Sequence, residues 1–172
     1  MDNEFLIHLT GVCALVLNVL AIIVTCERRL RVHSGIAGLI WALNNLLLGA
    51  HSAAALSLVS AGRTASSAVT LQGAAAPRRF AFVGFAALTM IVCALTWQGW
   101  LSVVLLTALL LSTYAMFYMQ GPALRWVMLL VSMLWMINAW SYGSWEQVAA
   151  NAATAATALY AAWRAERAVS QS

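Results

Sequence analysis

The sequence predicts an all-α integral membrane protein with seven transmembrane helices and little mass outside the bilayer. Of the 172 residues, 63% are hydrophobic and only 8% are charged, whereas a soluble globular chain carries about 25% charged residues. The mean hydropathy is +0.86. Apolar runs of about the 20 residues that a membrane helix needs fill most of the chain. A soluble catalytic domain is therefore excluded.

Seven apolar runs define the expected helices in order. The first is interpreted as a retained helix, because a signal peptide would begin with basic residues and this chain begins with Asp2 and Glu4. The third is the weakest, because it is rich in alanine and serine and contains Arg63. The expected spans are residues 5–25 before the basic sequence 27–31, 35–48 before Gly49, 52–71 before Pro77, 80–96 before the aromatic sequence 97–100, 101–119 before Pro122, 126–140 before Gly143, and 145–162 before Arg164.

The charged residues separate onto the two sides of the expected membrane. Seven alternating crossings place eight of the nine arginines on one side and Asp2, Glu4 and Glu146 on the other. Since basic residues face the cytoplasm, the N-terminus is expected outside and the C-terminus inside. Six spans, without the third, are the alternative, and they would break this segregation. The eight arginines are Arg28, Arg29, Arg31, Arg78, Arg79, Arg125, Arg164 and Arg167.

An internal repeat relates the two halves of the chain. An offset of 94 residues aligns residues 6–64 with 100–158 without a gap. In this register Trp41 matches Trp135, Asn44 matches Asn138 and Gly49 matches Gly143, so the motif W-x-x-N-x-x-x-x-G occurs twice. Such matches are informative because these residue types are rarer in this chain than alanine and leucine.

The repeat predicts two three-helix bundles joined by a linker helix, a 3+1+3 plan. The first bundle is expected in residues 1–73, the linker helix in 74–99 and the second bundle in 100–172. Three helices alone would insert the second copy upside down, and the fourth helix restores its direction. The bundles are therefore expected to be parallel and related by an axis along the membrane normal.

Several motifs resemble those of the YgjV-like bacterial inner membrane proteins. They are the sequences 27–30 and 48–50 and Arg63 in the first half, and the sequence 96–100, Trp135 with Asn138, and Gly143 with Ser144 in the second half. This resemblance implies a multi-pass protein of the bacterial inner membrane with a periplasmic N-terminus, and it implies no substrate. The chain departs from it at Trp145-Glu146, where relatives tend to have small apolar residues.

The helix plan as a whole resembles that of the SWEET and PQ-loop transporters. Asparagine pairs on the third helices line the pocket of SWEET proteins, and this resemblance adds Asn151 as a candidate site residue. The chain lacks the helix-interior prolines of those transporters, because Pro77 and Pro122 are both expected in loops. A proline-hinged motion is therefore in doubt.

The repeated motif suggests a substrate site at mid-membrane depth. Counted from His33 at about 1.5 Å per residue, Trp41 and Asn44 lie roughly 12 and 16 Å into the bilayer, near the middle of a core about 30 Å thick. Trp135 and Asn138 lie at matching depth. Amides suit hydroxyl groups or a nucleobase edge, and indoles offer flat apolar faces. The alternative for these residues and Asn151 is structural, since asparagine often joins membrane helices.

Arg63 is expected in the inner half of the bilayer, where a charge is costly and commonly functional. It is predicted to bind an anionic group or to form an inner gate, with Glu27 and Glu166 as candidate ion-pair partners. The alternative is that its long stem carries the charge to the cytoplasmic surface.

Two functions remain open at this point. The first is a facilitative transporter of a small neutral polar metabolite resembling a sugar, nucleoside or vitamin, since no carboxylate is expected at mid-membrane depth for ion coupling. The second is a non-transporting membrane receptor or scaffold. No catalytic, metal-binding or phosphate-binding motif is present, so no enzyme activity, metal or cofactor is expected. The arginines form short clusters between apolar runs, so no nucleic-acid partner is expected. Membrane lipid is the expected surrounding, and a homo-oligomer is compatible with the sequence.

Overall fold

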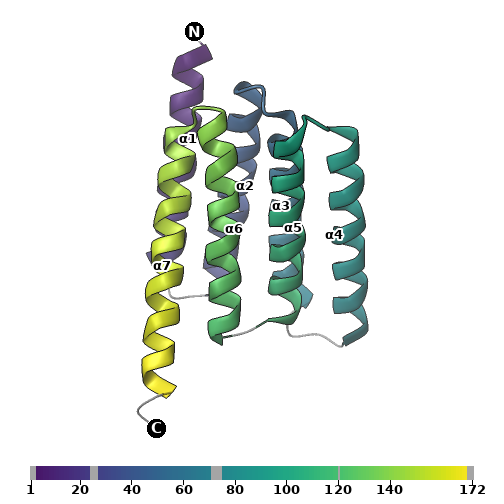
Figure 1. Ribbon diagram of the computed structural model, residues 1–172, viewed down its shortest axis with the longest axis vertical. Coiled ribbons are helices and arrows are strands. Elements are labelled where there is room, and N and C mark those ends of the chain that lie inside the picture. The colour runs from purple at the N-terminus through teal and green to yellow at the C-terminus, as the bar shows by residue number, and fades with distance from the viewer. Residues whose placement is uncertain (1–2, 24–26, 71–74, 120, 170–172) are drawn as a thin grey trace.

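The computed structural model describes residues 3–23, 27–70, 75–119 and 121–169, and all regular structure in these ranges is α-helical. All seven helices run nearly parallel or antiparallel to one another (Figure 1). They are α1 (Asn3–Ile23), α2 (Glu27–Leu47), α3 (His51–Thr70), α4 (Ala75–Leu95), α5 (Trp100–Tyr118), α6 (Gly121–Ser141) and α7 (Trp145–Val169).

The helices form two rows. Helices α1, α2 and α3 pack in sequence order, and α5, α6 and α7 do the same. The rows join at both ends, where α1 packs on α7 and α3 packs on α5. Helix α4 lies outside this ring of six and packs against α3 and α5 (Figure 1).

Several polar side chains are fully buried while many large apolar side chains are exposed, which is unlike a soluble fold. Asn44, Asn45 and Asn138 are fully buried. The outer surface carries large apolar residues on all the helices, for example Leu43 on α2 and Leu58 on α3. Among the described residues, four helices contain stretches long and apolar enough to cross a membrane, namely α1, α4, α5 and α6. Water would not favour this distribution, because it leaves the largest apolar side chains exposed.

Several helices begin earlier than the apolar spans. Helix α2 starts at Glu27 rather than residue 35, and α4 starts at Ala75 rather than residue 80. The expectation that Pro77 and Pro122 lie in loops is wrong, since both occupy the first turn of a helix. Proline is tolerated there because the first amide groups of a helix have no partner within it. The hydrophobicity of the sequence thus locates the apolar part of a helix but does not fix the residue at which the helix begins.

Matching turns end α2 and α6. Gly49 has a φ of 75° and Gly143 a φ of 68°, in the left-handed region that favours glycine. The Gly49 amide donates to the Leu46 carbonyl at 3.1 Å, and the Gly143 amide donates to the Trp140 carbonyl at 3.1 Å. The next amides, of residues 50 and 144, both donate to carbonyls five residues earlier at 2.9 Å. The two turns therefore share one hydrogen-bond pattern, the Schellman motif.

Candidate functional site

Asn44 joins three helices. Its amide nitrogen donates to the Ile7 carbonyl at 2.7 Å and to the Thr10 hydroxyl at 3.0 Å, both on α1. Its amide oxygen accepts from the Ser144 hydroxyl, 3.4 Å away at the start of α7. Since the side chain is fully buried and both ends of the amide are engaged, Asn44 holds α1, α2 and α7 together in this conformation.

Asn138 has the same place on α6, and both asparagines lie three residues before the end of their helix rather than near its middle as expected. The surroundings of the two differ. It is fully buried, and neither its amide nitrogen nor its amide oxygen has a hydrogen-bond partner among the described residues. In the 94-residue register, Val104 stands where Thr10 does and Ala50 where Ser144 does. The second half therefore lacks the two hydroxyl groups that satisfy Asn44. A buried amide without a partner costs about 1–3 kcal/mol, so Asn138 is a place where a polar molecule would gain hydrogen bonds.

The two predicted tryptophans lie in different parts of the core. Trp41 packs in a cluster with Ala14 of α1 and Ala150 of α7. Trp135 packs against a second cluster, formed by α3, α4 and α5 around Leu56 and Leu105. The structure thus places each indole at a junction between the rows and does not bring the two into one cluster. Their role in substrate binding stays a prediction.

Asn151 is partly buried, and its amide nitrogen donates to the Gln147 carbonyl one turn earlier in α7 at 2.9 Å. Asn45 donates to the Ser57 hydroxyl of α3 at 3.4 Å, while its own oxygen has no partner among the described residues. The oxygen of buried Gln147 is equally unpartnered in that part of the chain. Sequence reasoning missed Gln147, because its partner in the repeat register is the apolar Ala53.

Arg63 crosses from α3 to α5. Its guanidinium donates to the Ser60 hydroxyl at 3.0 Å, to the Thr113 hydroxyl at 3.2 Å and to the Ser112 hydroxyl. Only 5% of the residue is exposed, so the charge is held between helices and does not reach the surface. The side chains of the candidate partners Glu27 and Glu166 lie outside the described residues. The structure therefore shows a cation held by neutral oxygens of α3 and α5.

A polar network at the opposite end of α3 was not foreseen. The Gln98 side chain accepts from the Ser52 amide at 2.9 Å and donates to the Gly49 carbonyl at 3.0 Å. The Ser52 and Ser102 hydroxyls lie 3.0 Å apart, and the Ser52 hydroxyl also donates to the Thr96 carbonyl. Gln98 belongs to the aromatic sequence that follows the fourth expected span, and its side chain fastens the α4–α5 loop to the α2–α3 turn.

A second contact joins the rows at α1 and α7. The ring nitrogen Nδ1 of His8 lies 2.6 Å from the Glu146 carboxylate. Glu146 is in the first turn of α7, as expected, and it lies over Gly11, where an added Cβ would be 3.1 Å from it. In the 94-residue register Glu146 corresponds to Ser52 and His8 to Ser102. The two contacts, between His8 and Glu146 and between Ser52 and Ser102, therefore join equivalent positions of the repeat. The register could have predicted one contact from the other.

Comparison with known proteins identifies one family. The family model described as "Imp-YgjV: Bacterial inner membrane protein" matches residues 5–169, nearly the whole chain. No curated protein and no solved structure matches the chain.

Proposed function

Because the chain belongs to the YgjV family of bacterial inner membrane proteins, we propose that it crosses that membrane seven times and carries a small neutral polar metabolite by facilitated diffusion. Membrane residence follows from the family and from the apolar helices. The number of crossings, the orientation, the duplication and the transport activity are the proposed parts, and each has its own support.

Seven crossings are supported by the position of the three more polar helices. Helices α2, α3 and α7 run alongside the four that are apolar enough to span (Figure 1). They also point apolar side chains outward, such as Leu39 on α2, Leu58 on α3 and Leu159 on α7. Their polar residues, including Asn44, Arg63 and Gln147, are buried between helices, so these helices meet lipid mainly through apolar atoms.

The orientation follows from the arginines. With seven crossings, Arg78, Arg79 and Arg125 lie at the ends of α4 and α6 that would face the cytoplasm, and Glu146 lies at the opposite end of the bundle. The positive-inside rule then gives a periplasmic N-terminus and a cytoplasmic C-terminus.

Duplication is supported by three corresponding features. The turns at Gly49 and Gly143 have the same hydrogen bonds. The order of helices around the ring is the order that a two-fold axis along the membrane normal would produce, with α1 beside α7 and α3 beside α5. The contact between Ser52 and Ser102 has its counterpart in the contact between Glu146 and His8. Parallel repeats of this kind can rock against each other to expose a central site alternately to either side.

Asn138 is the observation that carries the transport proposal. Its amide is fully buried and unsatisfied in the described part of the chain, and it offers both donors and acceptors. The substrate that fits such a group is neutral and hydroxyl- or amide-bearing, as sugars, nucleosides and several vitamins are. In this proposal Trp135 supplies an apolar face, Asn44 holds its own bundle together, Asn151 lines the path, and Arg63 closes the inner end by bridging α3 to α5.

A scaffold or receptor without transport is the second candidate. The hydrogen bonds of Asn44 and Arg63 favour it, because both residues join helices across the interior. In this case the two halves would stay locked, and no solute would pass between them. The two candidates predict different behaviour for Asn138.

The test uses the full chain in detergent, with its melting temperature measured against neutral sugars, nucleosides and vitamins. A carrier is expected to be stabilised by members of one class, and Asn138→Ala is expected to abolish that shift. The double variant Ala50→Ser with Val104→Thr supplies hydroxyls at the positions that match Ser144 and Thr10. It is expected to weaken ligand binding at least tenfold, because protein hydroxyls then compete for the Asn138 amide. Thr107→Val, on an exposed residue of α5, is the control and should leave binding unchanged.

Counterflow in liposomes completes the test. The same solute is expected to exchange across liposomes that contain the wild type and not across those that contain Asn138→Ala. If no solute stabilises the protein and no counterflow is observed, the transport proposal is wrong and the scaffold is favoured. Undiminished binding by Asn138→Ala would remove Asn138 from the site even if transport is found.

A further inference from the structure

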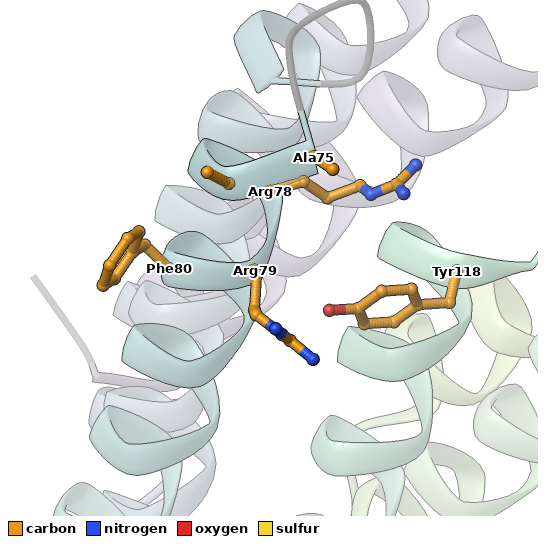
Figure 2. Close-up of a pocket in the computed structure, with 6 residues that line it drawn as sticks. Ala75, Arg78, Arg79, Phe80 and Tyr118 are labelled. Carbon is orange, nitrogen blue, oxygen red and sulfur yellow. The ribbon is translucent and has the colours of Figure 1, made fainter.

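A groove opens between the start of α4 and the end of α5, at the end of the bundle that carries the arginine clusters. Its volume is about 510 Å³ (Figure 2). This surface, here called the α4–α5 groove, is lined by Ala75, Ala76, Arg78, Arg79, Phe80 and Tyr118. It lies apart from the buried Asn138, and the transport proposal makes no use of it.

The groove concentrates positive charge. The Arg78 guanidinium carbon lies 5.6 Å from the centre of the Tyr118 ring, within the range of a cation–π contact. This contact holds Arg78 across the groove, and the side-chain atom Nε of Arg78 is buried without a hydrogen-bond partner among the described residues. Arg79 is exposed, and Figure 2 shows its side chain reaching from α4 towards Tyr118. Within the described ranges no carboxylate forms an ion pair with either arginine.

An apolar surface adjoins the charged residues. Val83 of α4 is 56% exposed, whereas the Phe80 ring points to the other side of α4 from Tyr118 (Figure 2). On α5, Tyr114 and Tyr118 are exposed. The Phe82 ring of α4 packs edge-on against the Tyr118 ring, with 5.1 Å between the ring centres. The groove therefore combines two arginines and a phenol at the helix ends with an apolar wall that continues along the helices.

We propose that the α4–α5 groove binds an anionic phospholipid. Arg78 and Arg79 contact the phosphate, the Tyr118 hydroxyl donates a hydrogen bond to it, and the acyl chains lie along Val83 and Tyr114. Arginine suits phosphate because its planar guanidinium presents several donors at once. Basic pockets between membrane helices are a known type of site for phosphate headgroups. A free phosphate would match the arginines alone, whereas the apolar wall beside them favours a lipid.

The experiment measures lipid retention by native mass spectrometry of the full chain, together with its melting temperature. Phosphatidylglycerol is expected to be retained, and phosphatidylcholine is not. Arg78→Gln with Arg79→Gln is expected to lower phosphatidylglycerol retention at least tenfold. Arg125→Gln removes one positive charge from an exposed position at the same end of the bundle, on α6, and it should leave retention unchanged.

The outcomes separate the sources of phosphate. Equal retention of both lipids, or an undiminished signal from the double variant, would overturn the proposal. Equal stabilisation by inorganic phosphate would overturn the assignment to a lipid. If the double variant does not fold, Arg79→Gln alone is compared with Arg125→Gln, because Arg79 is exposed and its replacement leaves the Arg78–Tyr118 contact in place. A selective loss of phosphatidylglycerol in that variant supports the proposal, and equal retention overturns it.

Discussion

Asn44 and Asn138 show how the surroundings of a residue decide what the same amide does. Both are fully buried and both precede the same turn by five residues. Thr10 and Ser144 satisfy Asn44, whereas Val104 and Ala50 stand at the matching positions around Asn138. The Asn44 amide therefore contributes hydrogen bonds to the fold, and the Asn138 amide has no hydrogen-bond partner in the described ranges.

This difference gives a prediction for matched alanine variants. Asn44→Ala is expected to reduce the free energy of unfolding by about 1–2 kcal/mol, since it removes three hydrogen bonds between helices. Asn138→Ala is expected to change stability little or to increase it, because no protein partner is lost. Denaturation of the two variants in the same detergent, without added solute, provides the measurement. Equal losses would show that Asn138 has protein partners after all.

Close contacts between elements depend on small residues at particular crossings. At Gly11 of α1, an added Cβ would lie 3.1 Å from Glu146 of α7. At Gly38 of α2, it would lie 3.1 Å from Ala61 of α3. Gly84 of α4 has no neighbour within 4 Å of such an atom. Small residues of this kind let membrane helices approach closely, since no hydrophobic force drives them together within lipid.

The glycines predict different costs for the same substitution. Gly11→Ala is expected to destabilise the protein by about 1–3 kcal/mol, because it crowds Glu146 and pushes α1 from α7. Gly84→Ala is expected to be neutral or slightly stabilising, since alanine favours a helix over glycine by about 1 kcal/mol. The melting temperatures of the two variants test this contrast. A neutral Gly11→Ala would mean that α7 can shift without cost and that the junction is loose.

At the scale of the whole molecule, the distribution of charge and the order of the helices both support the proposed orientation in the membrane. The ring of six helices places α1 beside α7 and α3 beside α5, and the fourth helix packs outside it. Arg78 and Arg125 lie at one end of the bundle and Glu146 at the other. The proposed orientation therefore requires that the two ends of each helix face opposite sides of the membrane.

The two ends of α6 test this orientation. In a full chain with Cys13, Cys26 and Cys93 replaced by serine, Ser141→Cys and Ala123→Cys place a thiol at an exposed position near either end. A membrane-impermeant maleimide is expected to label Ser141→Cys in intact cells. Ala123→Cys is expected to react only after the cells are made permeable. The reverse pattern would invert the proposed topology.

Much of the fold could be predicted because membrane insertion depends on properties that are local in the sequence. Apolar runs identified helices in the right places, and Gly49 and Gly143 identified two turns with the same geometry. Helix starts were less predictable. Glu27 begins α2 and Pro77 lies in the first turn of α4, because the backbone hydrogen bonds of a helix can begin before its apolar run does.

The sequence alone determined that this is a helical membrane protein, since that conclusion needs only composition and the length of the apolar runs. The tertiary structure decided how the polar residues are used. It set Asn44 among hydroxyl and carbonyl partners, left Asn138 without partners in the described part of the chain, and gave Arg63 the hydroxyls of α5. The physical reason is that a hydrogen bond depends on distance and direction between groups far apart in the chain, and only helix packing fixes these.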